Sequence, residues 1–193
     1  VELNVGMRER QEKVVNSLEG INYRWSNIEE LSSTPVTGVV IANEVLDAFP
    51  LERLVFTENK VFRQGVSLRK INDEYFLEFV DLSPTSAIMK FLQDSNSLLN
   101  IEFPPKGICN RWVTEWHCDI PIWFEQLSKI LINGPLLVVD YAMESKRYYN
   151  AIRKDGTLIS YRDQKANPNI LKDAGMSDLT AHLCVESTIN YAL

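Results

Sequence analysis

The sequence predicts an α/β fold built on a parallel sheet. Two continuous apolar runs support this prediction, because such runs are typical of buried parallel strands: residues 37–42 (TGVVIA) and residues 134–141 (GPLLVVDY). The segment before the second run, residues 120–134, has helical spacing and ends in Gly134. A helix that leads into a buried strand is half of a βαβ unit. We therefore expect helices packed on a parallel core sheet.

The amino-terminal region is predicted to contain a helix, a strand and a turn before the first buried run. Residues 5–19 place apolar side chains on or near one helical face, and Gly20 suits the end of that helix. Residues 21–25 (INYRW) alternate as a strand does. Residues 26–32 (SNIEELS) predict a short capped turn that leads to Pro35.

An insertion separates the two buried runs. Residues 51–133 are far more than the dozen or so that a crossover helix needs. Residues 51–82 alternate apolar and polar side chains and break at TENK, RQG and KINDE, which predicts an antiparallel meander. Residues 83–100 begin with Ser-Pro and predict a helix. We expect an inserted antiparallel β and helical subdomain beside the parallel sheet.

Composition excludes several classes of function. The 193 residues are 45% hydrophobic, enough for one folded domain, and the net charge of −6 opposes binding to nucleic acid. Three cysteines without CxxC spacing predict neither a disulfide framework nor a metal site, and they favour a reducing compartment. No apolar run approaches the roughly 18 residues that a membrane span requires.

Polar side chains stand where the two buried runs end. Asn43 and Glu44 follow the first run, Asp47 lies three residues after Glu44, and Asp140 and Tyr141 end the second. Ligands of open α/β sheets bind at the carboxyl ends of strands. If this segment begins a helix, its two carboxylates share one face and can hold a cation. The alternative is that Asn43 or Asp47 caps the helix and Glu44 is solvated.

Both histidines favour structural interpretations. Adjacent residues His117 and Cys118 point to opposite faces of a strand, so together with Cys109 they do not predict a zinc site. His182 is interpreted as the side chain of a helix capped by Ser177 or Asp178, with a part in chemistry as the alternative.

Six segments carry a resemblance to a known family. They are residues 1–11 (VELNVGMRERQ), 38–56 (GVVIANEVLDAFPLERLVF), 114–125 (TEWHCDIPIWFE), 136–142 (LLVVDYA), 147–162 (RYYNAIRKDGTLISYR) and 177–183 (SDLTAHL). They resemble successive motifs of the MidA family, class I methyltransferase-like proteins that include a mitochondrial complex I assembly factor. The resemblance covers nearly all of the chain. It implies a Rossmann-like sheet with the inserted subdomain as the substrate region.

The resemblance implies a cofactor, S-adenosyl-L-methionine, and residues that would bind it. Glu2 would accept hydrogen bonds from the ribose hydroxyls, as an acid that ends the second strand does in nucleotide-binding sheets. Trp25 and Ser26, at the end of the third strand, would flank the adenine. Asn43 would face the sulfonium.

The implied acceptor is an arginine side chain of a protein, a respiratory complex I type protein by the same resemblance. Asn43, Glu44 and Asp47 are the expected catalytic residues. The two carboxylates would orient the protonated guanidinium and stabilise its charge, and one of them would accept the released proton. Tyr141 would line the same pocket, with a buried, hydrogen-bonded structural role as the alternative.

The resemblance also implies a first strand with a glycine-rich loop, and nothing in the sequence precedes Val1. We therefore expect an internal fragment that by itself binds S-adenosyl-L-methionine weakly or not at all. Residues 1–50 would be a partial cofactor-binding core, residues 51–133 the substrate region and residues 134–193 the last core strand with the closing motifs, all in one structural domain. The alternative function is an inactive binding or assembly module. The expected compartment is the cytoplasm of a bacterium or the mitochondrial matrix of a eukaryote.

Overall fold

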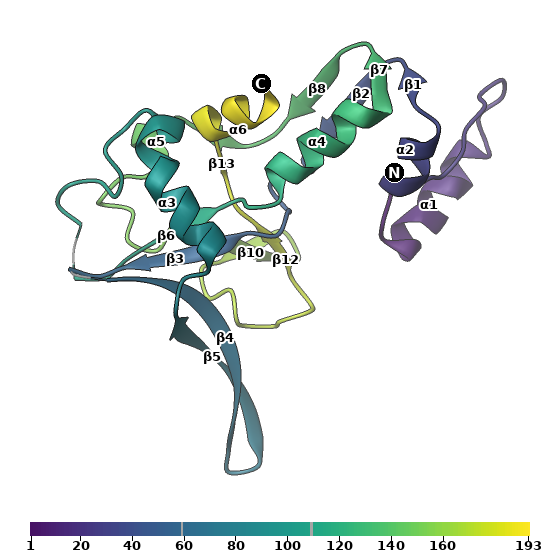
Figure 1. The fold of residues 1–193 in the computed structure, drawn as a ribbon. Coiled ribbons are helices and arrows are strands. Elements are labelled where there is room, and N and C mark those ends of the chain that lie inside the picture. The colour runs from purple at the N-terminus through teal and green to yellow at the C-terminus, as the bar shows by residue number, and fades with distance from the viewer. Residues whose placement is uncertain (59, 109) are drawn as a thin grey trace. The chain divides into compact units, whose positions relative to one another are not determined.

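The computed structural model describes residues 1–58, 60–108 and 110–193 (Figure 1). These residues form two compact units: Val1–Ile41 with Trp123–Leu137, and Ala42–Ile122 with Val138–Leu193. The predicted α/β class is confirmed at the level of a mixed α/β chain, because helices alternate with strands. The strands form several small sheets rather than one continuous parallel sheet.

The first unit holds the amino-terminal helices and one short parallel pair of strands. Its complete elements are α1 (Val5–Val15), α2 (Ile28–Ser33), β1 (Val36–Thr37) and β7 (Leu131–Asn133). It also holds α4 (Ile120–Ile130) from Trp123 onward and the first two residues of each of β2 (Val40–Asn43) and β8 (Leu136–Val139). β1 and β7 pair in parallel. Gly134 is required beside them, because a Cβ there would lie 1.7 Å from the carbonyl oxygen of Gly38.

Expectations for the first unit are met in part. The amino-terminal helix is confirmed as α1, which ends at Val15, and the capped turn is confirmed as α2 with a capping box at Asn27. The strand at residues 21–25 is wrong: these residues have no partner strand in the described chain, and the rings of Tyr23 and Trp25 pack edge to face at 6.4 Å. The helix expected over 120–134 ends at Ile130, where β7 begins.

The two apolar runs are confirmed as neighbouring parallel strands, β2 (Val40–Asn43) and β8 (Leu136–Val139). Val40 N donates to Pro135 O at 3.1 Å and Glu44 N to Val139 O at 2.8 Å. Both the donors and the acceptors move toward the carboxyl terminus by the same number of residues, which is the pattern of parallel strands. Their expected full burial is wrong. One face is solvent-exposed, with Ile41 68% and Leu137 51% exposed, because the pair has no further strand or layer over that face among the described residues.

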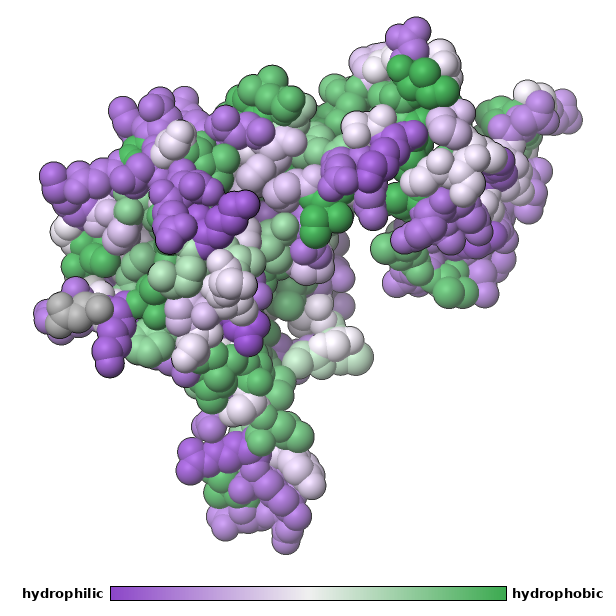
Figure 2. Space-filling model, viewed as in Figure 1, coloured by the Kyte–Doolittle hydropathy of each residue, from purple (hydrophilic) through white to green (hydrophobic). Residues whose placement is uncertain are grey.

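A four-stranded antiparallel sheet in the order β5-β4-β3-β6 dominates the second unit. Its strands are β3 (Glu52–Phe56), β4 (Val61–Ile71), β5 (Glu74–Leu82) and β6 (Trp112–Trp116). The predicted meander is confirmed, although the RQG segment lies inside β4 and does not break it. The β4–β5 hairpin projects from the sheet (Figure 1) and shows hydrophobic residues beside hydrophilic ones on its surface (Figure 2).

The core of the second unit lies between this sheet and helices. The helix expected after the meander is confirmed as α3 (Ser86–Leu99). It packs with β3, β6 and α5 (Ser145–Tyr148), while α6 (Val185–Ala192) contacts both helices. Buried members of this core include Leu54, Phe56, Phe91, Trp112 and Tyr148.

The last part of the chain forms a small sheet beside this core. β10 (Ile159–Arg162) pairs antiparallel with both β11 (Lys165–Asn167) and β12 (Asp178–Thr180). Asp163 and Gln164 make the two-residue turn with φ of 50° and 61°. β9 (Ala142–Met143) pairs in parallel with β13 (Leu183–Cys184). The helix expected around Asp178 is therefore wrong, because this residue begins β12.

Candidate functional site

The turn that follows β2 differs from the expected helix. Glu44 has a left-handed backbone with φ of 48°, which a non-glycine residue rarely adopts. The Asp140 carboxylate accepts hydrogen bonds from the backbone N–H groups of Leu46 and Asp47, at 3.0 and 3.2 Å. These donors are therefore held by the end of β8 rather than by a helix. Neither Asn43 nor Asp47 caps a helix here.

Asp47 lies buried beneath this turn, with 8% of its surface exposed. Its Oδ2 atom accepts a hydrogen bond of 2.5 Å from Thr180 Oγ1. Its Oδ1 atom is also buried and has no hydrogen-bond partner among the described residues. Half of this buried carboxylate therefore has no donor among the described residues.

Glu44 is exposed and is oriented by Tyr141. The phenol of Tyr141 donates to Glu44 Oε1 at 3.1 Å, and this hydrogen bond raises the pKa of Tyr141. The buried structural role for Tyr141 is wrong, because 54% of the residue is exposed. Its ring lies 6.2 Å from that of His182.

Glu44, Asp47 and Tyr141 line one cavity of about 750 Å³ in the second unit. The other lining residues come from the small carboxyl-terminal sheet and its flanks: Ile159, Tyr161, Asp163, Gln164, Asp178, Thr180 and His182. Four of these ten residues are carboxylates, and none is Lys or Arg. We name this space the acidic cavity. Its charge suits a cation.

The remaining predicted site residues lie elsewhere. Asn43 ends β2 beside Glu44, is exposed, and does not line the acidic cavity. Glu2, Trp25 and Ser26 belong to the first unit. Glu2 accepts hydrogen bonds from Asn4 N at 2.8 Å and Gln11 Nε2 at 3.2 Å.

Trp25 and Ser26 differ in whether their side-chain donors make hydrogen bonds within the chain. The indole N–H of Trp25 is buried and has no acceptor in the part of the chain that the structure describes. The hydroxyl of Ser26 donates to Glu30 at 2.8 Å. Trp25 therefore keeps a free donor, whereas Ser26 is occupied locally.

Sequence reasoning missed the half of the acidic cavity that the carboxyl-terminal sheet supplies. Tyr161 lies in the GTLISYR segment, and Asp178 and His182 lie in SDLTAHL, so the signal was present as motifs without an assigned role. Burial lowers the pKa of His182, and the charges of Arg153 and Arg147 lower it further. His182 is thus a neutral imidazole near neutral pH.

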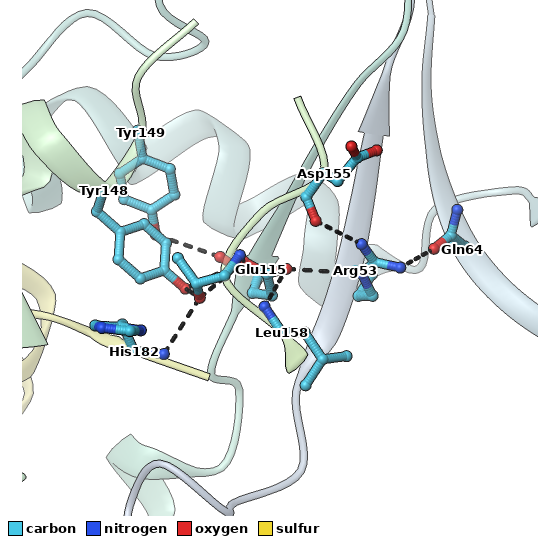
Figure 3. Close-up of polar contacts among 9 residues, drawn as sticks. Arg53, Gln64, Glu115, Tyr148, Tyr149, Asp155, Leu158 and His182 are labelled. Carbon is cyan, nitrogen blue, oxygen red and sulfur yellow. Dashed lines mark hydrogen bonds and ion pairs between the residues drawn. The ribbon is translucent and has the colours of Figure 1, made fainter. Parts of the chain in front are cut away.

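A buried glutamate holds this half of the cavity in place (Figure 3). Glu115 is fully buried and accepts hydrogen bonds from Thr157 N at 2.9 Å, Leu158 N at 3.3 Å and the Tyr148 hydroxyl at 3.4 Å. Arg53 Nε lies 3.6 Å from the same carboxylate. Burial raises the pKa of Glu115 despite these partners.

The Glu115 network extends to the cavity lining. Thr157 Oγ1 accepts a hydrogen bond of 3.2 Å from His182 N, which fixes the backbone at His182. Gly156 has φ of 75°, and a Cβ there would lie 1.9 Å from Glu115 Oε1. Only glycine fits this close approach.

His117 is a second buried titratable group beside the site. Its Nε2 atom has no hydrogen-bond partner among the described residues, and burial lowers its pKa to about 4 against the opposing charge of Asp47. Burial raises the pKa of the Cys118 thiol to about 11, and Cys109 lies outside the described residues. The described part of the chain holds no group of three His, Cys, Asp or Glu residues placed to bind a metal ion.

Comparison with known proteins identifies relatives of the whole chain. Residues 1–192 match the family described as "Putative S-adenosyl-L-methionine-dependent methyltransferase". No curated protein matches the chain. Within the described residues, no helix has the length and apolar character to cross a bilayer.

Two solved structures from Burkholderia thailandensis resemble this fold. One, a superfamily member and likely methyl transferase bound to S-adenosyl-homocysteine, has a TM-score of 0.72 and 22% identity, and the match covers 98% of this chain and 46% of that one. The other, the native structure of an uncharacterized protein of the same superfamily, has a TM-score of 0.68 and 23% identity, with 97% and 46% covered. The chain thus spans less than half the length of either, and the likeness shows a shared fold.

Proposed function

The chain belongs to this family of putative S-adenosyl-L-methionine-dependent methyltransferases, and we propose that the protein transfers a methyl group from that cofactor to an arginine side chain of another protein. The acidic cavity carries the proposal, because four carboxylates line it and one of them has a buried oxygen without a donor among the described residues. Leaving such an oxygen unpaired is costly. A cationic N–H group from a substrate would remove that cost.

The two carboxylates have different parts in holding a guanidinium. Asp47 lines the cavity, with one oxygen fixed by Thr180 and the Oδ1 atom buried without a donor among the described residues. Glu44 is exposed and held by Tyr141, so it contributes a second oriented acceptor. A guanidinium presents its donors in a rigid planar fork, which suits two oriented carboxylates.

Methyl transfer also requires a proton acceptor. S-adenosyl-L-methionine supplies an electrophilic methyl group when bound. As the new N–C bond forms and the C–S bond of the donor breaks, the attacked nitrogen must lose a proton. We assign this proton to the Asp47 carboxylate, because its Oδ1 atom has no donor among the described residues. Glu44 keeps the remaining positive charge stabilised.

The first unit fits a nucleoside through two observations. Each carboxylate oxygen of Glu2 accepts one hydrogen bond within the chain, so both retain capacity for ribose hydroxyls. The indole N–H of Trp25 has no acceptor in the described chain. Glu2 would hold the ribose, and Trp25 and Ser26 would flank the adenine.

The narrower identity of the acceptor rests on the resemblance to the MidA family. We propose that it is a protein of the respiratory complex I type. Incubation of the protein with separated complex I subunits and labelled cofactor, followed by mass spectrometry for methylarginine, tests this proposal independently of the acidic cavity.

Replacement of Glu44 by glutamine tests the proposed function. Glu44→Gln preserves shape and removes one charge-assisted hydrogen bond, worth about 1.5–3 kcal/mol, so we expect kcat/KM for an arginine peptide to fall about tenfold to a hundredfold. The melting temperature and the affinity for S-adenosyl-L-methionine should stay unchanged, since Glu44 is exposed and supports no core contact.

Glu9→Gln is the matched control, because Glu9 is an exposed glutamate of α1 with no side-chain hydrogen bond or ion pair in the described chain. This variant should retain full activity. Unchanged transfer by a stable Glu44→Gln protein would contradict the assignment. Peptide binding by the wild-type protein without any transfer would favour the binding or assembly module instead.

A further inference from the structure

A second cavity of about 540 Å³ adjoins the acidic cavity. The two share the lining residues Ile159, Tyr161 and His182, so they lie side by side within the second unit. Three arginines line the second cavity: Arg53, Arg111 and Arg153. The two cavities therefore share one wall.

The two cavities carry opposite charge. The acidic cavity has four carboxylates and neither Lys nor Arg. Among the lining residues of the second cavity, Asp155 is the only carboxylate, against three guanidinium groups. A ligand that spans both would match them best with a cation at one end and an anion at the other.

Two of the three arginines already have partners. The Arg53 guanidinium donates to Gln64 Oε1 at 2.5 Å and to the carbonyl oxygen of Asp155 at 2.7 Å, and its Nε atom faces Glu115 (Figure 3). Arg111 makes two hydrogen bonds to the Asp81 carboxylate, at 2.7 and 2.9 Å. The Arg111 donors and the terminal nitrogens of Arg53 are thus committed to the fold, and Arg53 Nε, which makes no hydrogen bond, is paired ionically with Glu115.

Arg153 is the exception. Its Nη2 atom donates to the Met143 sulfur at 3.5 Å, which is a weak acceptor. Its Nε atom is buried and makes no hydrogen bond, as is also true of Arg53 Nε, but Arg153, unlike Arg53, has no ion pair in the described part of the chain. A buried guanidinium donor without an acceptor is costly, and a carboxylate forms the strongest complement to it.

We propose that Arg153 binds a carboxylate of the acceptor polypeptide while the arginine to be methylated occupies the acidic cavity. This inference rests on the proposed function, because it takes the acidic cavity as the acceptor site. The substrate class follows from it: segments in which an acidic group lies a short distance along the chain from the target arginine. Tyr161 and His182 form the wall between the two subsites.

Fluorescence anisotropy with synthetic peptides tests the inference. Each peptide is capped at both ends and carries one arginine, with a glutamate moved through the neighbouring positions. We expect the best glutamate peptide to bind about tenfold more tightly than its glutamine counterpart, the value of one charge-assisted hydrogen bond. Arg153→Met should abolish this advantage. Arg153→Lys should keep only part of it, because the charge remains and the planar fork is lost.

Arg147→Met is the matched control, because Arg147 is a nearby exposed arginine that does not line the second cavity. It should keep the glutamate advantage, and an equal loss in this variant would overturn the inference. If Arg153→Met does not fold, Arg153→Lys and the peptide pair on wild-type protein carry the test. An uncapped peptide whose terminal carboxylate replaces the glutamate distinguishes a chain-end carboxylate from a side chain, and equally tight binding of it supports the carboxylate subsite.

Peptides with citrulline in place of arginine separate this inference from the proposed function. Equal binding of glutamate and glutamine peptides, with loss of binding on citrulline substitution, would overturn the inference and leave the proposed function standing. Binding that citrulline substitution leaves unchanged would overturn the arginine acceptor, and a glutamate advantage in those peptides would still support the carboxylate subsite. Failure of every peptide to bind would overturn both.

Discussion

Two buried carboxylates of the second unit, Glu115 and Asp47, differ in how many hydrogen-bond partners the fold gives them. Glu115 accepts hydrogen bonds from two backbone N–H groups and two hydroxyls and faces Arg53, so its oxygens are matched by the fold. Asp47 has one oxygen matched by Thr180 and the other matched by no described residue. The difference separates a carboxylate that supports structure from one that remains available to a ligand.

The two regions are mechanically connected. The Glu115 network fixes the backbone at Thr157, Leu158 and His182, and His182 lines both cavities. The turn that carries Asp47 is fixed separately, by Asp140 at the end of β8. The wall at His182 therefore depends on Glu115, a carboxylate whose hydrogen bonds are all made within the fold. The wall at Asp47 presents a carboxylate with one oxygen unpaired among the described residues.

Loss of Glu115 is expected to have the largest effect. Glu115→Ala removes the carboxylate that pairs with Arg53 and leaves several buried donors without an acceptor, so the free energy of unfolding should fall by about 3–5 kcal/mol in urea denaturation. Glu78→Ala is the matched control, because Glu78 is a half-exposed glutamate paired with Arg69 on the hairpin. It should change stability by about 0.5 kcal/mol or less. If Glu115→Ala lowers the free energy of unfolding by less than about 1 kcal/mol, Glu115 is not the structural carboxylate that the comparison with Asp47 assumes.

Acidification tests whether Asp47 is truly unpaired. The pKa of His117 is lowered from 6.5 to about 4 in the folded protein, so the unfolded chain binds more protons between these values. The folded state holds His117 neutral, so the free energy of unfolding is unaffected by this group above pH 6.5 and decreases as the pH falls toward 4. The expected loss is about 3 kcal/mol.

Urea denaturation at several pH values on the wild-type protein and His117→Gln measures this loss. His182→Gln is the parallel variant, because the pKa of His182 is lowered in the same direction. The acid-dependent loss should shrink most in His117→Gln. If that variant leaves the pH profile unchanged, His117 is protonated against Asp47 in the folded protein, and the buried carboxylate has a partner after all.

Local periodicity was sufficient for the elements that depend on local contacts. The helices α1, α3 and α4, the β4–β5 hairpin and the parallel pair β2–β8 were all predicted. It failed at residues 44–49, which form no helix. Glu44 has a left-handed backbone there, and Asp140, more than 90 residues away, accepts the N–H groups of Leu46 and Asp47.

The candidate site was likewise predictable only where local sequence patterns place its residues. Glu44, Asp47 and Tyr141 follow two strands that periodicity identifies, and the structure brings them to one cavity. Asp163, Asp178 and Thr180 reach that cavity through the pairing of β10 with β11 and β12, which no local pattern specifies. The roles of Glu2, Trp25, Ser26 and Asn43 stay predictions.

The smallest expected effect concerns the rim of the acidic cavity. Tyr141→Phe removes one exposed hydrogen bond to Glu44, so stability should change by only about 0.5 kcal/mol. Glu44 then loses its orientation, and KM for an arginine peptide should rise a few-fold while kcat changes less. Steady-state kinetics and urea denaturation on one preparation measure both quantities. A stability loss as large as that of Glu115→Ala would show that the Tyr141–Glu44 hydrogen bond supports the fold. A rise in KM without a loss of stability would support Glu44 and Asp47 as residues that face the ligand.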